Sequence, residues 1–340
     1  MSTRVDAVDD AVPGAADEPL LSVRGLGVTF ASRGRRAVRA VDGIDLDVSA
    51  GSTVGIVGES GSGKSVTSLA ALGLLGKRGV TVTGSVTFDG QDLLRMPEHE
   101  LRAVRGREIA MIFQDPMSSL NPVLTVGRQI TEILERHRAL KGQAARDCAA
   151  ELLESVGIGD AVRRLRSFPH QLSGGMRQRV MIAMALACEP RLLIADEPTT
   201  ALDVTISAQI LDLLRLLVSG SSTALVLITH DLGVVAGMCD VVHVMYAGRI
   251  VESAARRPLF AAPRHPYTTG LLASVPRLDA ARNVALRPIP GSPSDTLPWT
   301  SGCAFAPRCE RRVEPCTDGP PSLVDEGAHL VRCVNPQPAR

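Results

Sequence analysis

Residues 53–65 read TVGIVGESGSGKS, and this stretch decides the class of fold. TVGIV has the composition of a buried strand, and the glycine-rich loop behind it fits the pattern G-x4-G-K-[ST]. In such loops glycines let backbone N–H groups turn inward around phosphate oxygens, the lysine reaches the β/γ-phosphates, and the serine hydroxyl binds Mg²⁺. The helix that follows adds its positive N-terminal end. The sequence therefore predicts a nucleotide phosphate site made by Gly58, Glu59, Ser60, Gly61, Ser62, Gly63, Lys64, Ser65 and Val66.

Strands and helices alternate along most of the chain, which predicts an α/β fold with a mostly parallel sheet. Three segments with alternating apolar and polar residues predict an additional antiparallel β portion. We expect these three strands at 20–30, 44–48 and 80–88, buried strands at 53–57, 109–113, 192–195, 224–229 and 241–245, and helices at 65–75, 176–188 and 204–218.

Two regions depart from this alternation. Between about 115 and 175 the pattern becomes helical and polar-faced, with helices expected at 126–140 and 144–156, so we expect an inserted helical subdomain. Beyond 258 proline becomes dense and four of the seven cysteines occur, which predicts an extension with little regular structure. The expected organisation is a disordered lead-in at 1–18, a nucleotide-binding domain at 19–258 and a C-terminal Pro/Cys-rich extension at 259–340.

A pair of carboxylates follows one of the buried strands. LLIAD at 192–196 ends in Asp196, and Glu197 comes next. Adjacent carboxylates in a dry site are unfavourable without a cation, so Asp196 is expected to hold Mg²⁺. Glu197 is the candidate base that polarises the attacking water. A plain acidic pair at a strand end is the alternative.

Residues 172–179 read LSGGMRQR. This motif is specific to far fewer protein families than the phosphate-binding loop, which occurs in many unrelated nucleotide enzymes. It resembles the signature of ATP-binding cassette (ABC) ATPases, a P-loop NTPase family. Members of that family pack head to tail, so that each ATP lies between the loop of one subunit and the signature of the other. A helix starting near Ser173 presents free N–H donors to an anion. The resemblance implies that Ser173, Gly174 and Gly175 contact an ATP held by a second subunit.

The resemblance implies roles for four further positions, which occur in the family's order. Gln114 corresponds to the glutamine that senses Mg²⁺ and the attacking water, and His230 to the switch histidine that contacts the γ-phosphate. Asp203 corresponds to the aspartate that faces the other subunit. Phe30 lies where the family stacks an aromatic ring on adenine, with core packing as the alternative. The implied cycle is ATP-driven closure, hydrolysis at Glu197 and opening.

Composition limits the cellular context. The formal net charge of +1 gives no argument for a nucleic-acid partner. No apolar run approaches the ~18 residues that span a bilayer, and residues 1–18 lack the apolar stretch of a secretory signal. We therefore expect a peripheral protein at the cytoplasmic face of the cell membrane, with any membrane role supplied by partners.

Within the ABC ATPases, three non-transport classes fit poorly. The interval between Lys64 and Ser173 leaves no room for the coiled coil of chromosome-maintenance ATPases. Translation-factor ATPases carry two cassettes in one chain, and repair ATPases interrupt the cassette with large insertions. A transporter ATPase with separately encoded membrane subunits fits best, and a free-standing ABC ATPase remains the alternative class.

The extension narrows this resemblance. HPYT at 265–268, IPGSP at 289–293 and GCAFAPRC at 302–309 resemble the C-terminal region of the oligopeptide/dipeptide/nickel importer ATPases, as does QDPMSSLNP at 114–122. The resemblance implies uptake of short peptides, with two membrane permease subunits, an extracytoplasmic substrate-binding protein and a second ABC ATPase. We expect that second ATPase to be a different chain, forming a heterodimer. Nickel or another small solute is the alternative cargo.

Four cysteines of the extension form a candidate metal site: Cys303, Cys309, Cys316 and Cys333. A cytosolic location argues against disulfides. The spacings lack the short CxxC pairs of structural zinc sites, and they suit an iron–sulfur cluster, which accepts four cysteines at varied spacing. We expect a [4Fe–4S] cluster, with zinc and unligated structural thiols as alternatives. The other cysteines are expected to be packing residues.

Overall fold

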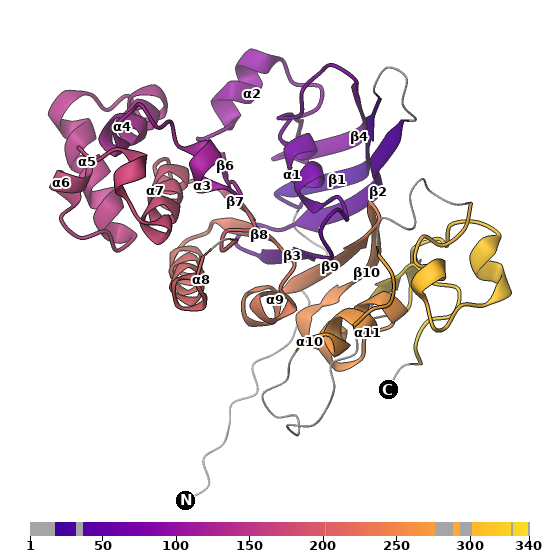
Figure 1. Ribbon diagram of the computed structural model, residues 1–340. Coiled ribbons are helices and arrows are strands. Elements are labelled where there is room, and N and C mark those ends of the chain that lie inside the picture. Colours follow the sequence, from indigo (N-terminus) through magenta and orange to yellow (C-terminus); the bar gives the residue numbers. More distant parts are fainter. Residues whose placement is uncertain are drawn as a thin grey trace, which may run out of the picture.

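The strand that leads into the phosphate-binding loop, β3, lies inside an eight-stranded sheet of order β11-β12-β10-β9-β3-β8-β7-β6 (Figure 1). The five strands from β9 to β6 run parallel, and β10, β12 and β11 continue the sheet antiparallel. Helices such as α7 (Gly174–Leu186) and α9 (Leu232–Met238) cover one face of the parallel part, and helix α1 (Lys64–Ala71) together with a second sheet covers the other, which explains its continuous apolar runs. The strands are β3 (Thr53–Val57), β6 (Ile109–Ile112), β7 (Leu192–Asp196), β8 (Ala224–Thr229), β9 (Val241–Tyr246), β10 (Arg249–Ala255), β11 (Val324–Asp325) and β12 (His329–Val331).

This computed structural model describes residues 18–31, 37–200, 202–275, 288–292, 301–327 and 329–338. The lead-in predicted at 1–18 lies outside the described residues except for Glu18.

A second, four-stranded antiparallel sheet has the order β2-β1-β4-β5. Its apolar face packs on helix α1 and on β3, β7 and β8, because Val28, Ile44 and Val86 share one buried cluster with Ile56 and Ile194. The predicted antiparallel portion is thus present. Its strands are β1 (Leu21–Phe30), β2 (Val38–Val48), β4 (Val80–Phe88) and β5 (Gln91–Asp92).

The predicted helical subdomain projects to one side of the parallel sheet (Figure 1). Its longest helices bury an apolar stripe that includes Ile130, Leu134 and Leu153, and Thr125 caps the first of them by accepting a hydrogen bond from Arg128 N–H. The elements are α3 (Pro116–Ser119), α4 (Val126–His137), α5 (Gly142–Ser155), α6 (Ala161–Arg164), η1 (Pro169–Gln171) and α7 (Gly174–Leu186).

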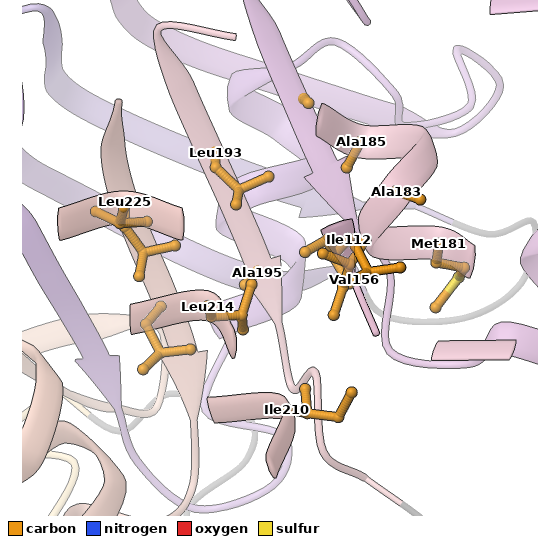
Figure 2. Close-up of a cluster of buried hydrophobic side chains, with 14 of the residues drawn as sticks. Ile112, Val156, Met181, Ala183, Ala185, Leu193, Ala195, Ile210, Leu214 and Leu225 are labelled. Carbon is orange, nitrogen blue, oxygen red and sulfur yellow. The ribbon is translucent and has the colours of Figure 1, made fainter. Parts of the chain in front are cut away.

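Helix α7 joins this arm to the sheet. Figure 2 shows Met181, Ala183 and Ala185 of α7 beside Ile112 at the end of β6, with Leu193 and Ala195 on the neighbouring β7. These side chains are buried in one cluster with Ile210 and Leu214 of α8. The helix that carries the LSGG segment therefore rests on the same sheet as the phosphate-binding loop.

Of the remaining helices, α1 and α8 were predicted, and α2, α9, α10 and α11 were not. Helix α1 stops at Ala71 and not near residue 75, because Gly73 has a φ of +61° and the Arg105 guanidinium binds the free carbonyls of Leu72 and Gly73 at 2.7 and 2.8 Å. The helices are α1 (Lys64–Ala71), α2 (Glu98–Val104), α8 (Val204–Ser219), α9 (Leu232–Met238), α10 (Arg256–Ala261), α11 (Pro266–Ala273), η3 (Ala306–Arg308) and η4 (Glu314–Thr317).

The extension is more regular than its composition predicts. Its strands β11 and β12 complete the main sheet beside β10. The fully buried Glu252 of β10 organises this junction: it accepts backbone N–H groups from Arg264 and His265 at 2.7 and 2.9 Å and lies 2.9 Å from Nδ1 of His329 on β12. Strands of two or three residues carry no periodicity, so the sequence could not reveal them.

No helix within the described ranges is both long enough and apolar enough to cross a membrane.

Replacing Glu252 with alanine should weaken the junction strongly, because two backbone donors and an imidazole would lose their buried partner. We expect the free energy of unfolding in urea to fall by about 3 kcal/mol. The exposed Glu310→Ala is the matched control and should change stability by less than about 0.5 kcal/mol. Equal stability of the two variants would contradict a structural role for Glu252.

Candidate functional site

The phosphate-binding loop is tightly packed at two of its glycines. A Cβ on Gly58 would lie 2.2 Å from the carbonyl oxygen of Met245, and one on Gly63 would lie 2.6 Å from that of Ala40. Both distances are shorter than any van der Waals contact, so only glycine fits. The loop is therefore shaped by the end of β9 and by β2.

Lys64 opens helix α1 and turns back into the loop. Its ammonium donates hydrogen bonds to the carbonyl oxygens of Gly58 and Glu59 at 2.8 and 3.0 Å. Burial lowers the pKa of Lys64, while the carboxylates of Glu197, Asp196 and Glu59 raise it. The buried Lys64 ammonium thus lies against the backbone of the loop.

Ser65 and Asp196, two of the three predicted Mg²⁺ ligands, meet although 131 positions separate them. The third, Gln114, is hydrogen-bonded to Glu197. Ser65 Oγ donates a hydrogen bond to Asp196 Oδ1 at 2.9 Å. Burial raises the pKa of Asp196, the Ser65 hydrogen bond lowers it, and the charge of Glu197 raises it further. A hard divalent cation prefers oxygen ligands such as this hydroxyl and this carboxylate. Its charge would also compensate the negative charge that burial disfavours here. The residues present therefore fit Mg²⁺.

The three predicted catalytic residues converge on one carboxylate. Glu197 accepts hydrogen bonds from Gln114 Nε2 at 3.0 Å and from Thr200 Oγ1 at 2.8 Å, and His230 Nδ1 lies 3.5 Å from its other oxygen. Glu197 also has a φ of +46°, a left-handed conformation that is strained for a side chain of this kind. The backbone conformation and these contacts hold the carboxylate between Gln114, Thr200 and His230. Its role as the base stays a prediction.

The signature residues occupy a separate part of the molecule. Ser173 caps helix α7 by accepting a hydrogen bond from Met176 N–H at 3.3 Å, and Gly174 and Gly175 form its first turn. Asp203 caps the adjacent helix α8 by accepting from Ile206 N–H at 2.9 Å. Helix α7 contacts β6 and α8, whereas α1 contacts β7 and the antiparallel sheet. The two predicted phosphate-binding ends thus sit on different elements.

Phe30 and Val66 are both half-buried, and both pack against the core cluster beneath the antiparallel sheet. This packing supplies a structural reason for each residue. The stacking of Phe30 on adenine stays a prediction.

Two residues that sequence reasoning missed contact the loop from the extension. Arg308 donates to both carboxylate oxygens of Glu59 at 2.7 and 3.0 Å, and the Tyr267 hydroxyl accepts a hydrogen bond from Glu59 N–H at 2.9 Å. The motif GCAFAPRC contains Arg308, but nothing local in it indicates a partner in the loop.

The four cysteines of the extension gather in one half-buried region. Cys303 N–H donates to the carbonyl of Cys316 at 2.8 Å. Burial raises the pKa of Cys303, Cys309 and Cys333, that of Cys333 to about 11, and the neighbouring thiols add to each increase. In the described part of the chain, no three His, Cys, Asp or Glu side chains converge closely enough for a single metal ion. The thiols are therefore neighbours without forming a one-ion site.

Known proteins match both parts of this arrangement. Residues 41–200 match the family model described as ABC transporter, and residues 251–316 match that of the oligopeptide/dipeptide transporter C-terminal region. The oligopeptide transport ATP-binding protein OppD of Salmonella typhimurium is 50% identical over 317 residues, which cover 93% of this chain and 94% of that protein. This chain belongs to the ABC transporter ATP-binding proteins.

Further relatives and solved structures agree with the assignment of this chain to the ABC transporter ATP-binding proteins. The dipeptide transport ATP-binding protein DppD of Bacillus subtilis is 50% identical over 318 residues, covering 93% of this chain and 94% of that protein. A dimeric ATP-binding cassette in a post-hydrolysis state with ADP and Pi superposes with a TM-score of 0.62 at 29% identity, covering 70% of this chain and 99% of that one. The cbiO1 cassette of Clostridium perfringens gives a TM-score of 0.59 at 28% identity, with coverages of 72% and 92%.

Substituting Glu197 with glutamine should abolish ATP turnover in this ABC ATPase while ATP still binds. Gln keeps the side chain's size but cannot accept the proton of the attacking water, so the hydrolysis rate should fall by about 10²- to 10⁴-fold. The exposed Glu189 also has a positive φ, and Glu189→Gln is the matched control. Phosphate release and retained nucleotide measure the two effects, and a Glu197→Gln protein with normal turnover would remove Glu197 as the base.

Proposed function

We propose that this chain is the ATP-hydrolysing subunit that powers binding-protein-dependent import of dipeptides or oligopeptides through separate membrane permease subunits. The observation that carries the proposal is the match of residues 251–316 to the oligopeptide/dipeptide transporter C-terminal region. Relatives at 50% identity over 93% of the chain are named as oligopeptide and dipeptide transport ATP-binding proteins. Import of nickel or another small solute by the same machinery is the second candidate.

In this proposal the chain's own residues prepare one half of an ATP site. Ser65 and Asp196 would hold Mg²⁺, which neutralises phosphate charge when bound. Lys64 brings a positive charge into the loop, and Gln114 and Thr200 orient Glu197 to accept a proton from water. His230 is largely exposed, so it is free to reach the γ-phosphate.

The other half of the site would come from a second ABC ATPase. Ser173, Gly174 and Gly175 begin a helix whose first N–H donors would bind the phosphates held by the loop of the other subunit. A dimeric cassette among the structural neighbours supports a second cassette as the partner. We favour a different chain as the partner, because related importers often pair two different ATPases.

The membrane partners would dock on the helical subdomain and on the loop after Gln114. Three exposed apolar side chains lie at or beside the loop, Phe113, Met117 and Val123, at 39%, 58% and 76%, and a fourth, Val162 at 67%, lies in α6 of the helical subdomain. Grouped exposed apolar residues are typical of interaction sites. The chain would therefore act at the cytoplasmic face of the membrane, bound to two permease subunits that receive cargo from a substrate-binding protein.

For the cysteine cluster we propose a [4Fe–4S] group before zinc, because the spacings of the four cysteines lack the CxxC pairs of structural zinc sites. A cube of four irons takes one thiolate on each iron, so its ligands need to surround a volume and not to meet at one point. The four thiols are buried or half-buried, and neighbouring thiols raise the pKa of Cys303, Cys309 and Cys333, so the four lie near one another, although among the described residues no three ligating side chains form a metal site. Bound there, the cluster would cross-link a segment with few strands and helices. Unligated thiols remain the alternative.

Peptide uptake tests the transport proposal directly. Deleting the gene should abolish uptake of a labelled tripeptide, the native chain should restore it, and the Glu197→Gln chain should not. Nickel uptake measured in the same strains separates the two cargoes. Normal peptide uptake in the deletion strain, together with lost nickel uptake, would overturn peptide import.

Metal analysis tests the cluster independently of transport. Protein purified without oxygen should contain about four irons and four sulfides per chain, and Cys333→Ser should lose both. Cys148→Ser, which alters a thiol in helix α5, is the matched control and should keep them. A folded, colourless, metal-free native protein would remove the cluster, and stoichiometric zinc would replace it.

A further inference from the structure

A salt bridge links the extension to the phosphate-binding loop. Arg308 of η3 presents two N–H groups to the two oxygens of Glu59, at 2.7 and 3.0 Å. Its side chain is only 2% exposed, and that of Glu59 is 27% exposed. Two parallel charge-assisted hydrogen bonds of this kind fix orientation as well as distance. The two residues are 249 positions apart in the chain, so the contact forms only in the folded protein.

The backbone of Glu59 is held from the same side. Its N–H donates to the hydroxyl of Tyr267 at 2.9 Å, and Tyr267 is fully buried on helix α11. Its carbonyl oxygen accepts a hydrogen bond from the Lys64 ammonium at 3.0 Å. The Glu59 N–H also shares a peptide unit with the Gly58 carbonyl, which accepts a hydrogen bond from Lys64 at 2.8 Å. The extension therefore holds a peptide unit that helps to position the phosphate-binding lysine.

The gripping residues rest on a rigid aromatic platform. Tyr246, Tyr267 and Phe305 have ring centroids 4.7 to 5.3 Å apart, and the platform contains both tyrosines of the chain. The Arg308 guanidinium lies 5.8 Å from the Tyr246 ring centroid and also donates to the Pro290 carbonyl at 2.8 Å. Such packing leaves Arg308 little freedom to move away from Glu59.

The charge of Glu59 makes this contact relevant to ATP. A carboxylate in a loop that receives a polyphosphate repels the ligand unless a cation neutralises it. Lys64 is required for the phosphates, and Arg308 is the cation that forms a bidentate pair with Glu59. Loss of Arg308 would leave a partly buried negative charge next to the phosphates and would release the peptide unit behind Lys64.

We propose that Arg308, with Tyr267, is a positioning residue for ATP binding: the C-terminal extension holds the phosphate-binding loop in shape and neutralises Glu59. The contacts are made by protein groups alone, whether or not the cysteines bind a cluster. The proposal rests on the ABC ATPase assignment and is independent of the cargo. It makes the extension part of the nucleotide site and not only an attachment to it.

The test measures ATP dissociation constants in the full chain, purified with its transporter partners, in the Glu197→Gln background so that ATP is not consumed. Arg308→Gln should raise the Kd for ATP about tenfold, and in the hydrolytically competent chain it should raise KM with kcat within about twofold. Arg311→Gln is the matched control, because the Arg311 guanidinium is hydrogen-bonded to two other residues of the extension, Asn335 and Pro336. It should leave both constants within about twofold.

A second substitution separates positioning from general stability. Adding Glu59→Gln to Arg308→Gln removes the uncompensated charge, so the double variant should bind ATP more tightly than Arg308→Gln alone. If Arg308→Gln does not fold, Tyr267→Phe provides the same test, with an expected increase in Kd of about threefold. An unchanged Kd in folded Arg308→Gln or Tyr267→Phe, or equal weakening by Arg311→Gln, would overturn the proposal. So would a double variant weaker than Arg308→Gln.

Discussion

The nucleotide site depends on one constraint: the charged side chains at the ends of the parallel strands must be compensated by opposite charges and hydrogen bonds. Lys64, Asp196 and Glu197 meet where β3 and β7 end, and burial shifts the pKa of Lys64 and of Asp196 away from the charged form. Only close opposite charges and hydrogen bonds keep such groups ionised in a low-dielectric region. Ser65 beside Lys64, Thr200 three residues after Glu197, and Gln114 after the end of β6 supply those hydrogen bonds. The sheet order places these groups together, because parallel strands end at the same edge.

The same need for charge compensation connects the C-terminal extension to the nucleotide-binding domain. Glu59 adds a further negative charge to the loop, and its compensation comes from Arg308 in the extension. Glu252 likewise joins β10 to β12 through a buried carboxylate that is fully hydrogen-bonded. Buried ionic contacts of this type are specific in geometry, since either partner alone would be unfavourable. The extension is therefore tied to the cassette at two polar points as well as through the apolar cluster around Tyr267 and Phe305.

Sequence reasoning succeeded where a pattern is local and failed where partners are distant. The strands at 53–57, 80–88 and 224–229 were predicted with their observed bounds, because each is a short apolar or alternating run between turn residues. Gln114, Glu197 and His230 were predicted one by one, and folding brings them to one carboxylate. The end of α1 was placed too late, because the Arg105 guanidinium that binds its last carbonyls lies outside the helix. Strands β11 and β12 were missed because they are too short to carry a period.

By itself, the sequence determined that a strand, a glycine-rich loop and a helix form a phosphate site, and that LSGG at 172–175 opens a helix of an ABC ATPase. Those features are encoded by neighbouring residues, whose backbone conformations and periodicity are local properties. Only the tertiary structure decided that Arg308 and Tyr267 hold Glu59, and that the four cysteines lie side by side. These partners are chosen by packing between distant segments, and the energy of a long-range contact leaves no trace in the local order of residues.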